Sequence, residues 1–150
     1  MVRLRRDHPV FRRRQFFQGR PIRGKDIKDI VWLSPDGKEM SDDEWNKSFA
    51  KCLGVYLSGE ALSERDERGR AITDDNFLLL FNAHHEEIRF AIANHDSEEE
   101  WQVLLDTHFE DGLPSERHVR PGAVYPLQGR SMAMLVSPRH KPSHAGEHRP

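Results

Sequence analysis

The chain has 150 residues, of which 36% are hydrophobic and 32% are charged, and its formal net charge is -2. This length suits one domain with extensions, and the composition lies on the polar side of the globular range, which predicts long loops or tails. The near-neutral charge excludes a general attraction to nucleic acid or anionic membranes. The single cysteine excludes an internal disulfide framework and favours a cytoplasmic location.

The first twenty residues are basic and partly apolar. Pro9 divides them into the last turns of one helix and a short helical turn that begins at His8, because proline lacks an N–H group. A helix that starts at Met1 without an N-cap residue is typical of the end of a longer helix. The arginines could bind phosphate groups, but the interleaved apolar residues favour a solvated helix face or a surface for another part of the same protein. They are Arg3, Arg5, Arg6, Arg12, Arg13, Arg14 and Arg20.

This N-terminus has no apolar core of the kind found in a secretory signal. No apolar run elsewhere approaches the roughly 20 residues needed to span a bilayer. We therefore expect neither a membrane nor a nucleic acid as a partner.

Residues 21–49 show turn chemistry and little helical periodicity. The sequence "SPDG" at 34–37 predicts a tight turn, and the apolar residues on either side of it predict a small hairpin. The sequence "SDDE" at 41–44 predicts a capping box, in which Ser41 and Glu44 bind each other's backbone N–H groups and start a short helix. A catalytic carboxylate cluster is the alternative interpretation, although helix starts commonly look like this.

Short apolar runs with a period of two follow from about residue 50, and each predicts a strand. Turn-forming segments separate these runs, with no helical period between them. The predicted fold class is therefore mainly β, an antiparallel β-sandwich of about 6–8 strands. The tail at 138–150 lacks apolar anchors and is predicted to be disordered. The predicted strands span residues 51–57, 76–83, 87–92, 101–107, 122–127 and 131–137.

The stretch "DDNFLLLFNAHHEEIRFAI" at 74–92 raises the question of a metal site. Its first half is apolar on both faces, which predicts a central strand, and its second half alternates. We therefore expect a β-hairpin whose turn at 82–87 carries His84 and His85. On an extended backbone these two rings would diverge, and zinc sites need three or four convergent donors, so we expect no metal here.

Other chemistry is not indicated by the sequence. Cys52 lies within a predicted strand, where a buried small thiol is commoner than a nucleophile. There is no glycine-rich phosphate loop, Walker motif or nucleophile elbow. We expect no catalytic residue, metal or other cofactor in this chain.

Several stretches together resemble one family. "RLRRDHPVFRRRQFFQGRPI" is similar to the end of the last barrel helix and the exit segment of isoamylase-type glycogen debranching enzymes, which belong to the α-amylase superfamily. "DIVWLSPDGKEMSDDEW" resembles the segment between their (β/α)8 barrel and C-terminal domain. "CLGVYLSG", "WQVLLDT" and "YPLQGRSMAMLV" match the C-terminal β-domain in order and spacing. The resemblance covers residues 3 to 137.

This resemblance implies a division of the chain into four parts. These are a remnant of the last barrel helix and exit segment (1–20), a linker with a small hairpin and helical turn (21–49), the C-terminal β-sandwich (50–137) and the tail (138–150). The family hydrolyses α-1,6 branch linkages by a retaining mechanism with two carboxylates, which lie at the ends of barrel strands. Both would precede Met1, so we expect a non-catalytic domain that supports the barrel and its glucan cleft, either separately encoded or truncated.

The apolar N-terminal residues then need a partner. We expect Phe11, Phe16 and Phe17 to pack on the β-domain or on another chain, because each buried phenylalanine contributes about 1.5–3 kcal/mol. The expected partners are a barrel domain or a second copy of this chain, and a glycogen-like α-glucan such as a limit dextrin.

A stand-alone carbohydrate-binding module for such α-glucans is the alternative function. Tyr56, Trp101 and Tyr125 could stack on sugars if they are exposed, but Trp101 begins a strand with an inward face. Trp32 and Trp45 flank turns, which makes these two the candidate carbohydrate-binding residues. Packing of these two indoles on each other, or on the barrel, is the competing interpretation. A nucleic-acid binder and a self-sufficient hydrolase fit the sequence less well.

Overall fold

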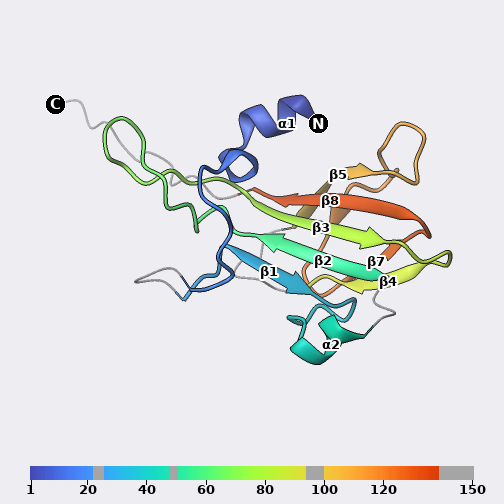
Figure 1. Ribbon diagram of the computed structural model, residues 1–150. Helices are drawn as coiled ribbons and strands as arrows, with labels where there is room; N and C mark the ends of the chain where they lie inside the picture. The colour runs from blue at the N-terminus through green and yellow to red at the C-terminus, as the bar shows by residue number, and fades with distance from the viewer. Residues whose placement is uncertain (22–25, 48–50, 94–99, 139–150) are drawn as a thin grey trace.

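The chain folds into an antiparallel β-sandwich with short helices outside it (Figure 1). The computed structural model describes residues 1–21, 26–47, 51–93 and 100–138. The helical elements there are α1 (Val2–Asp7), a 3-10 turn η1 (Pro9–Arg12) and α2 (Asp42–Asn46). The strands are β1 (Ile30–Leu33), β2 (Cys52–Leu57), β3 (Asn76–Asn82), β4 (Ile88–Ala91), β5 (Trp101–Asp106), β6 (His118–Val119), β7 (Val124–Leu127) and β8 (Ser131–Ser137).

Two sheets form the sandwich. Six strands make the larger sheet in the order β1-β2-β3-β8-β5-β6, and β4 and β7 make the smaller one. Every pair of neighbouring strands is antiparallel. The predicted fold class is therefore confirmed, and each of the six strands predicted from apolar runs is present.

The larger sheet is buried on both faces. Leu78 and Leu80 of β3 point into the core between the two sheets, together with Phe90 of β4. Phe77 of the same strand points the other way, into a second cluster that includes Val10 of the N-terminal segment. Alternate side chains of a strand point to opposite faces, so β3 is the central two-faced strand that its sequence predicted.

The N-terminal segment covers this second face. Val10 is only 1% exposed, and its backbone N–H donates to Asp74 Oδ2 at 3.0 Å. The His8 ring lies 2.7 Å from the other Asp74 oxygen, and the Phe11 ring packs edge-on against Phe77 at 4.6 Å. The segment is thus docked on the sandwich, as expected for Phe11.

Phe16 does not pack on the sandwich, since this side chain is 95% exposed, and its packing on another chain stays a prediction. Its neighbour Phe17 is 38% exposed and lies against the Arg13 guanidinium, 4.4 Å from the ring centroid. The contact with Arg13 keeps Phe17 beside the buried Arg13–Asp29 ion pair.

The predicted hairpin at 74–92 is also wrong, although both of its strands exist. β3 pairs with β2 and β8 in the larger sheet, whereas β4 pairs with β7 in the smaller one. The reason is Asn82, which is 2% exposed. Its side-chain amide donates to the carbonyl oxygens of Glu86, Leu127 and Gln128 at 2.9, 3.1 and 3.0 Å. The turn is therefore held at the β7–β8 connection and forms a corner between sheets.

The turn chemistry of residues 30–46 is confirmed. Ser34 N–H donates to the Lys38 carbonyl at 2.9 Å and closes the small hairpin, while Gly37 has a φ of +80° that favours glycine. Ser41 and Glu44 form the predicted capping box at the start of α2.

The two-residue strand β6 was not predicted. The tail lies outside the described residues from 139 onward. Among the described residues, no helix is long and apolar enough to cross a bilayer.

Candidate functional site

The two candidate tryptophans lie together on the outside of the domain. Trp32 comes from β1 and Trp45 from α2, and the hairpin between them closes with a hydrogen bond from Met40 N–H to the Trp32 carbonyl. The ring centroids are 5.4 Å apart with an interplanar angle of 77°, and the residues are 37% and 47% exposed. The packing of one indole on the other is thereby confirmed, and sugar binding by this pair remains a prediction.

A mainly apolar pocket of about 390 Å³ lies between the hairpin and the corner at His84. Met40, Cys52 and Ile88 contribute apolar surface, and Lys47 and Lys51 contribute positive charge. Cys52 is half-buried, and its Sγ lies 3.3 Å from Asn82 Oδ1 as a weak donor. Burial raises the pKa of the Cys52 thiol. The thiol is therefore protonated and a poor nucleophile at neutral pH.

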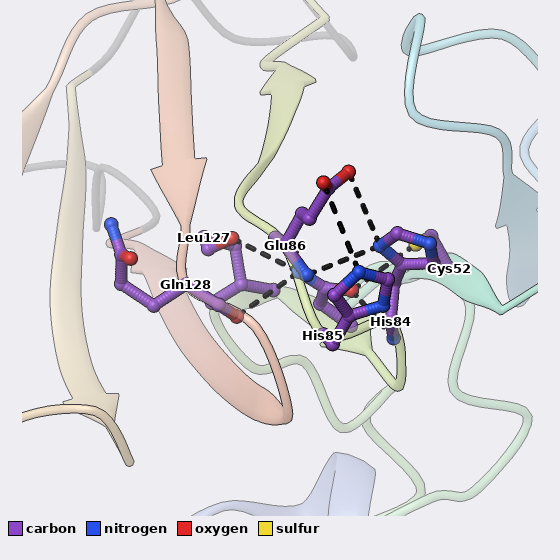
Figure 2. A network of polar contacts seen from close by, with 7 residues as sticks. Cys52, His84, His85, Glu86, Leu127 and Gln128 are labelled. Carbon is purple, nitrogen blue, oxygen red and sulfur yellow. Dashed lines mark hydrogen bonds and ion pairs between the residues drawn. The ribbon is translucent and has the colours of Figure 1, made fainter.

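The corner brings His84, His85 and Glu86 together, as Figure 2 shows. The histidine ring centroids are 4.3 Å apart and tilted by 32°, so the rings do not diverge as they would on an extended backbone. The cause is a turn in the backbone, in which His84 N–H donates to Asn82 Oδ1 and Glu86 N–H donates to His84 Nδ1.

One potential ligand atom from each of His84, His85 and Glu86 lies within 4.8 Å of the others. However, His84 Nδ1 is already occupied by a backbone N–H, and His85 and Glu86 are exposed. These three donors fall short of the closed four-ligand shell of a structural zinc site.

The remaining aromatic candidates are not on the surface. Tyr56, Trp101 and Tyr125 are 3%, 2% and 7% exposed, respectively. The Tyr125 hydroxyl donates to Asp106 Oδ2 at 2.5 Å. Burial, together with the Asp106 carboxylate, holds the pKa of Tyr125 well above its usual value. Tyr125 therefore keeps its proton and its hydrogen bond across the physiological pH range.

One edge of the buried Tyr125 lines a groove of about 630 Å³. This groove lies beside the β5–β6 connection and β7, and Phe109, which is 39% exposed, forms part of its wall. Sequence reasoning missed Phe109, because it is a single aromatic residue within a turn segment and belongs to no apolar run.

Comparison with known proteins gives the relationship directly. Residues 29–141 match the family described as "Isoamylase, C-terminal". The chain belongs to this isoamylase C-terminal domain family. The resemblance to isoamylase-type enzymes is thereby confirmed.

Relatives carry the name "Glycogen operon protein GlgX homolog" in Mycobacterium tuberculosis and Mycobacterium bovis. Each is 45% identical to this chain over 106 residues, which are 70% of this chain and 15% of the relative. The chain thus spans about a seventh of the length of these curated relatives. The tryptophan pair, the His84 corner and the Phe109 groove all fall inside the region that matches the family.

Proposed function

We propose that this chain is the non-catalytic C-terminal β-domain of a glycogen debranching enzyme, an α-1,6-glucan hydrolase. Its role is to support the catalytic barrel and to bound one side of the glucan cleft. Membership of the isoamylase C-terminal family and relatives named for the glycogen operon support this proposal.

The supporting role is inferred from the N-terminal segment, which is docked on the sandwich but leaves some apolar side chains exposed. The segment is docked through Val10 and a buried ion pair, in which Arg13 Nη2 lies 3.0 Å from Asp29 Oδ2. Met1, Val2 and Phe16 of the same segment are 75%, 87% and 95% exposed. In this proposal they are the side chains that contact the barrel, and the docked part of the segment holds them in place.

The test uses the relative from Mycobacterium tuberculosis with its matching 106 residues removed. Mixed with this chain, it is expected to form a one-to-one complex in size-exclusion chromatography and to melt at a higher temperature, because a partner that binds only the folded state stabilises it. Phe16→Ala should weaken the complex at least tenfold, since buried aromatic residues dominate interface energies.

Lys38→Ala is the matched control for that experiment. Its side chain is 83% exposed in the turn that follows β1, at the opposite end of that strand from Asp29 and the docked segment, and its removal should leave the complex unchanged. Wild-type chain that forms no complex with the truncated relative would contradict the proposed support of a barrel.

A second function, a carbohydrate-binding module for glycogen-like α-glucans, is favoured by the exposed indole faces of Trp32 and Trp45. Co-sedimentation with glycogen tests it: Trp32→Ala should weaken retention, whereas Phe16→Ala should not. If the wild-type chain stays in the supernatant, the module is excluded while the supporting role stands.

We also propose a cytoplasmic location, because the single cysteine suits a reducing compartment and glycogen metabolism is the context named for the relatives. Fractionation of the source cells tests this, and the chain in a secreted fraction would contradict it.

A further inference from the structure

We infer that the groove beside the β5–β6 connection is a binding site for a neutral oligosaccharide, separate from the tryptophan pair. The identification of that sugar as an α-glucan rests on the proposed function. The groove is about 630 Å³, within the range of about 300–1,000 Å³ typical of small-molecule sites. Its two walls come from the β5–β6 connection and from β7 with the residues next to it.

A buried carboxylate ties these two walls together. Asp106, at the end of β5, is 2% exposed. Its Oδ2 accepts the Tyr125 hydroxyl from the β7 wall at 2.5 Å, and its Oδ1 accepts the His108 backbone N–H from the opposite wall at 2.9 Å. The groove is thus formed before any ligand arrives, which lowers the entropic cost of binding.

The β5–β6 wall is itself ordered by backbone hydrogen bonds. Asp106 N–H donates to the Gly112 carbonyl at 2.7 Å, and Gly112 N–H donates to the Phe109 carbonyl at 2.9 Å. His108 packs edge-on against the Phe109 ring, with centroids 5.2 Å apart. The Phe109 ring is therefore fixed in orientation while it remains 39% exposed.

The apolar part of the lining suits the C–H faces of a sugar ring. Phe109 faces the groove from one wall, and Val124, which is 43% exposed, and Pro126 contribute to the other. Ligand sites usually combine apolar and aromatic surface of this kind with a few polar groups that fix the orientation of the ligand.

The polar part of the lining favours a neutral ligand over an anion. The Arg120 guanidinium pairs with Glu100 at 3.4 Å, so this cation is already neutralised. The Glu116 carboxylate is exposed and lines the groove, and no described residue pairs with it. The Glu116 carboxylate would repel a phosphate, whereas sugar hydroxyls can donate to it.

The test is a calorimetric titration of the full chain with maltoheptaose. Phe109→Ala and Glu116→Ala are each expected to bind about tenfold more weakly than wild type, the equivalent of about 1.4 kcal/mol. Phe16→Ala is the matched control, because it removes an aromatic ring that is exposed outside the groove, and it should bind like wild type. Circular dichroism of each variant checks that the sandwich is intact.

A second measurement locates the site without any substitution. In 1H–15N spectra, maltoheptaose should shift the amide signals of residues 107–117 and 124–128. Shifts confined to residues 32–45, or unchanged affinity in both groove variants, would overturn the inference and favour the tryptophan pair. Absence of binding, or binding that disappears at high salt, would also overturn it. Complex formation with the truncated relative does not depend on the groove, so failure here leaves the proposed function standing.

Discussion

Replacement of Asp29 by alanine should release the N-terminal segment from the domain. Asp29 is 1% exposed, and its carboxylate pairs with Arg13 at 3.0 Å. It also accepts the backbone N–H groups of Gln18 and Gly19, each at 2.9 Å. Among the described residues, Asp29 is the only charge partner of the Arg13 guanidinium, whose side chain is 7% exposed. Asp29→Ala removes this partner and also leaves the two amides without their acceptor.

The expected cost follows from the burial of this pair. Removal of one partner from a buried ion pair destabilises a protein by about 3–5 kcal/mol, because the remaining charge is left uncompensated. Arg13 Nη1 already lacks a hydrogen-bond partner among the described residues, so the site has no spare acceptor for the stranded guanidinium. At roughly 2–4 °C per kcal/mol for a chain of this size, the melting temperature should fall by about 10 °C.

Urea unfolding followed by tryptophan fluorescence measures this effect, since Trp101 is only 2% exposed in the core. The matched control is Asp7→Ala, which removes an ion pair to Arg6 whose side chains are 71% and 49% exposed and should change little. The double variant Arg13→Met with Asp29→Ala should recover part of the loss. Wild-type stability in Asp29→Ala, or strict additivity in the double variant, would refute the reasoning.

Three further predictions concern Tyr125, Cys52 and Gly37. Burial and the Asp106 carboxylate raise the pKa of Tyr125 above its ordinary 10.0. The stabilising contribution of Tyr125 is therefore complete below pH 10 and is lost as the pH rises towards the folded-state pKa. The urea midpoint of the wild-type chain should fall above pH 10, and that of Tyr125→Phe should fall less. Burial raises the pKa of Cys52, so iodoacetamide should alkylate the folded chain more slowly than the urea-unfolded chain at pH 8, and equal rates would contradict this. Gly37→Ala would place a Cβ 2.8 Å from the Ala91 carbonyl oxygen and should cost about 1–3 kcal/mol. Gly69→Ala, at a φ of +75° with open space around it, should cost less in the same thermal melts, and a greater cost would count against the clash.

The strands of this fold could be predicted from the sequence because apolar runs and turn residues are local signals. The central position of β3 followed from its two apolar faces in the same way. Its pairing did not follow, because the partner of β4 is set by Asn82, whose amide reaches carbonyls some 45 residues away in the chain. The pattern of apolar residues along the chain does not predict such a long-range contact.

The polar anchors of the N-terminal segment and the groove could not be predicted for the same reason. Asp29 and Asp74 are isolated polar residues that no periodicity marks, yet they anchor Arg13, His8 and Val10. Trp32 and Trp45 were recognisable from the sequence as aromatic residues beside turns. The position of Phe109 in a groove could not be predicted, because the groove depends on the hydrogen bonds of Asp106 to His108 and Tyr125.

The most direct test of the proposed supporting role is the release of reducing ends from glycogen. Three samples are compared: this chain alone, the Mycobacterium tuberculosis relative without its matching 106 residues, and the two mixed. We predict no release by the chain alone and greater release by the mixture than by the truncated relative. Release of reducing ends by the purified chain alone would contradict the account.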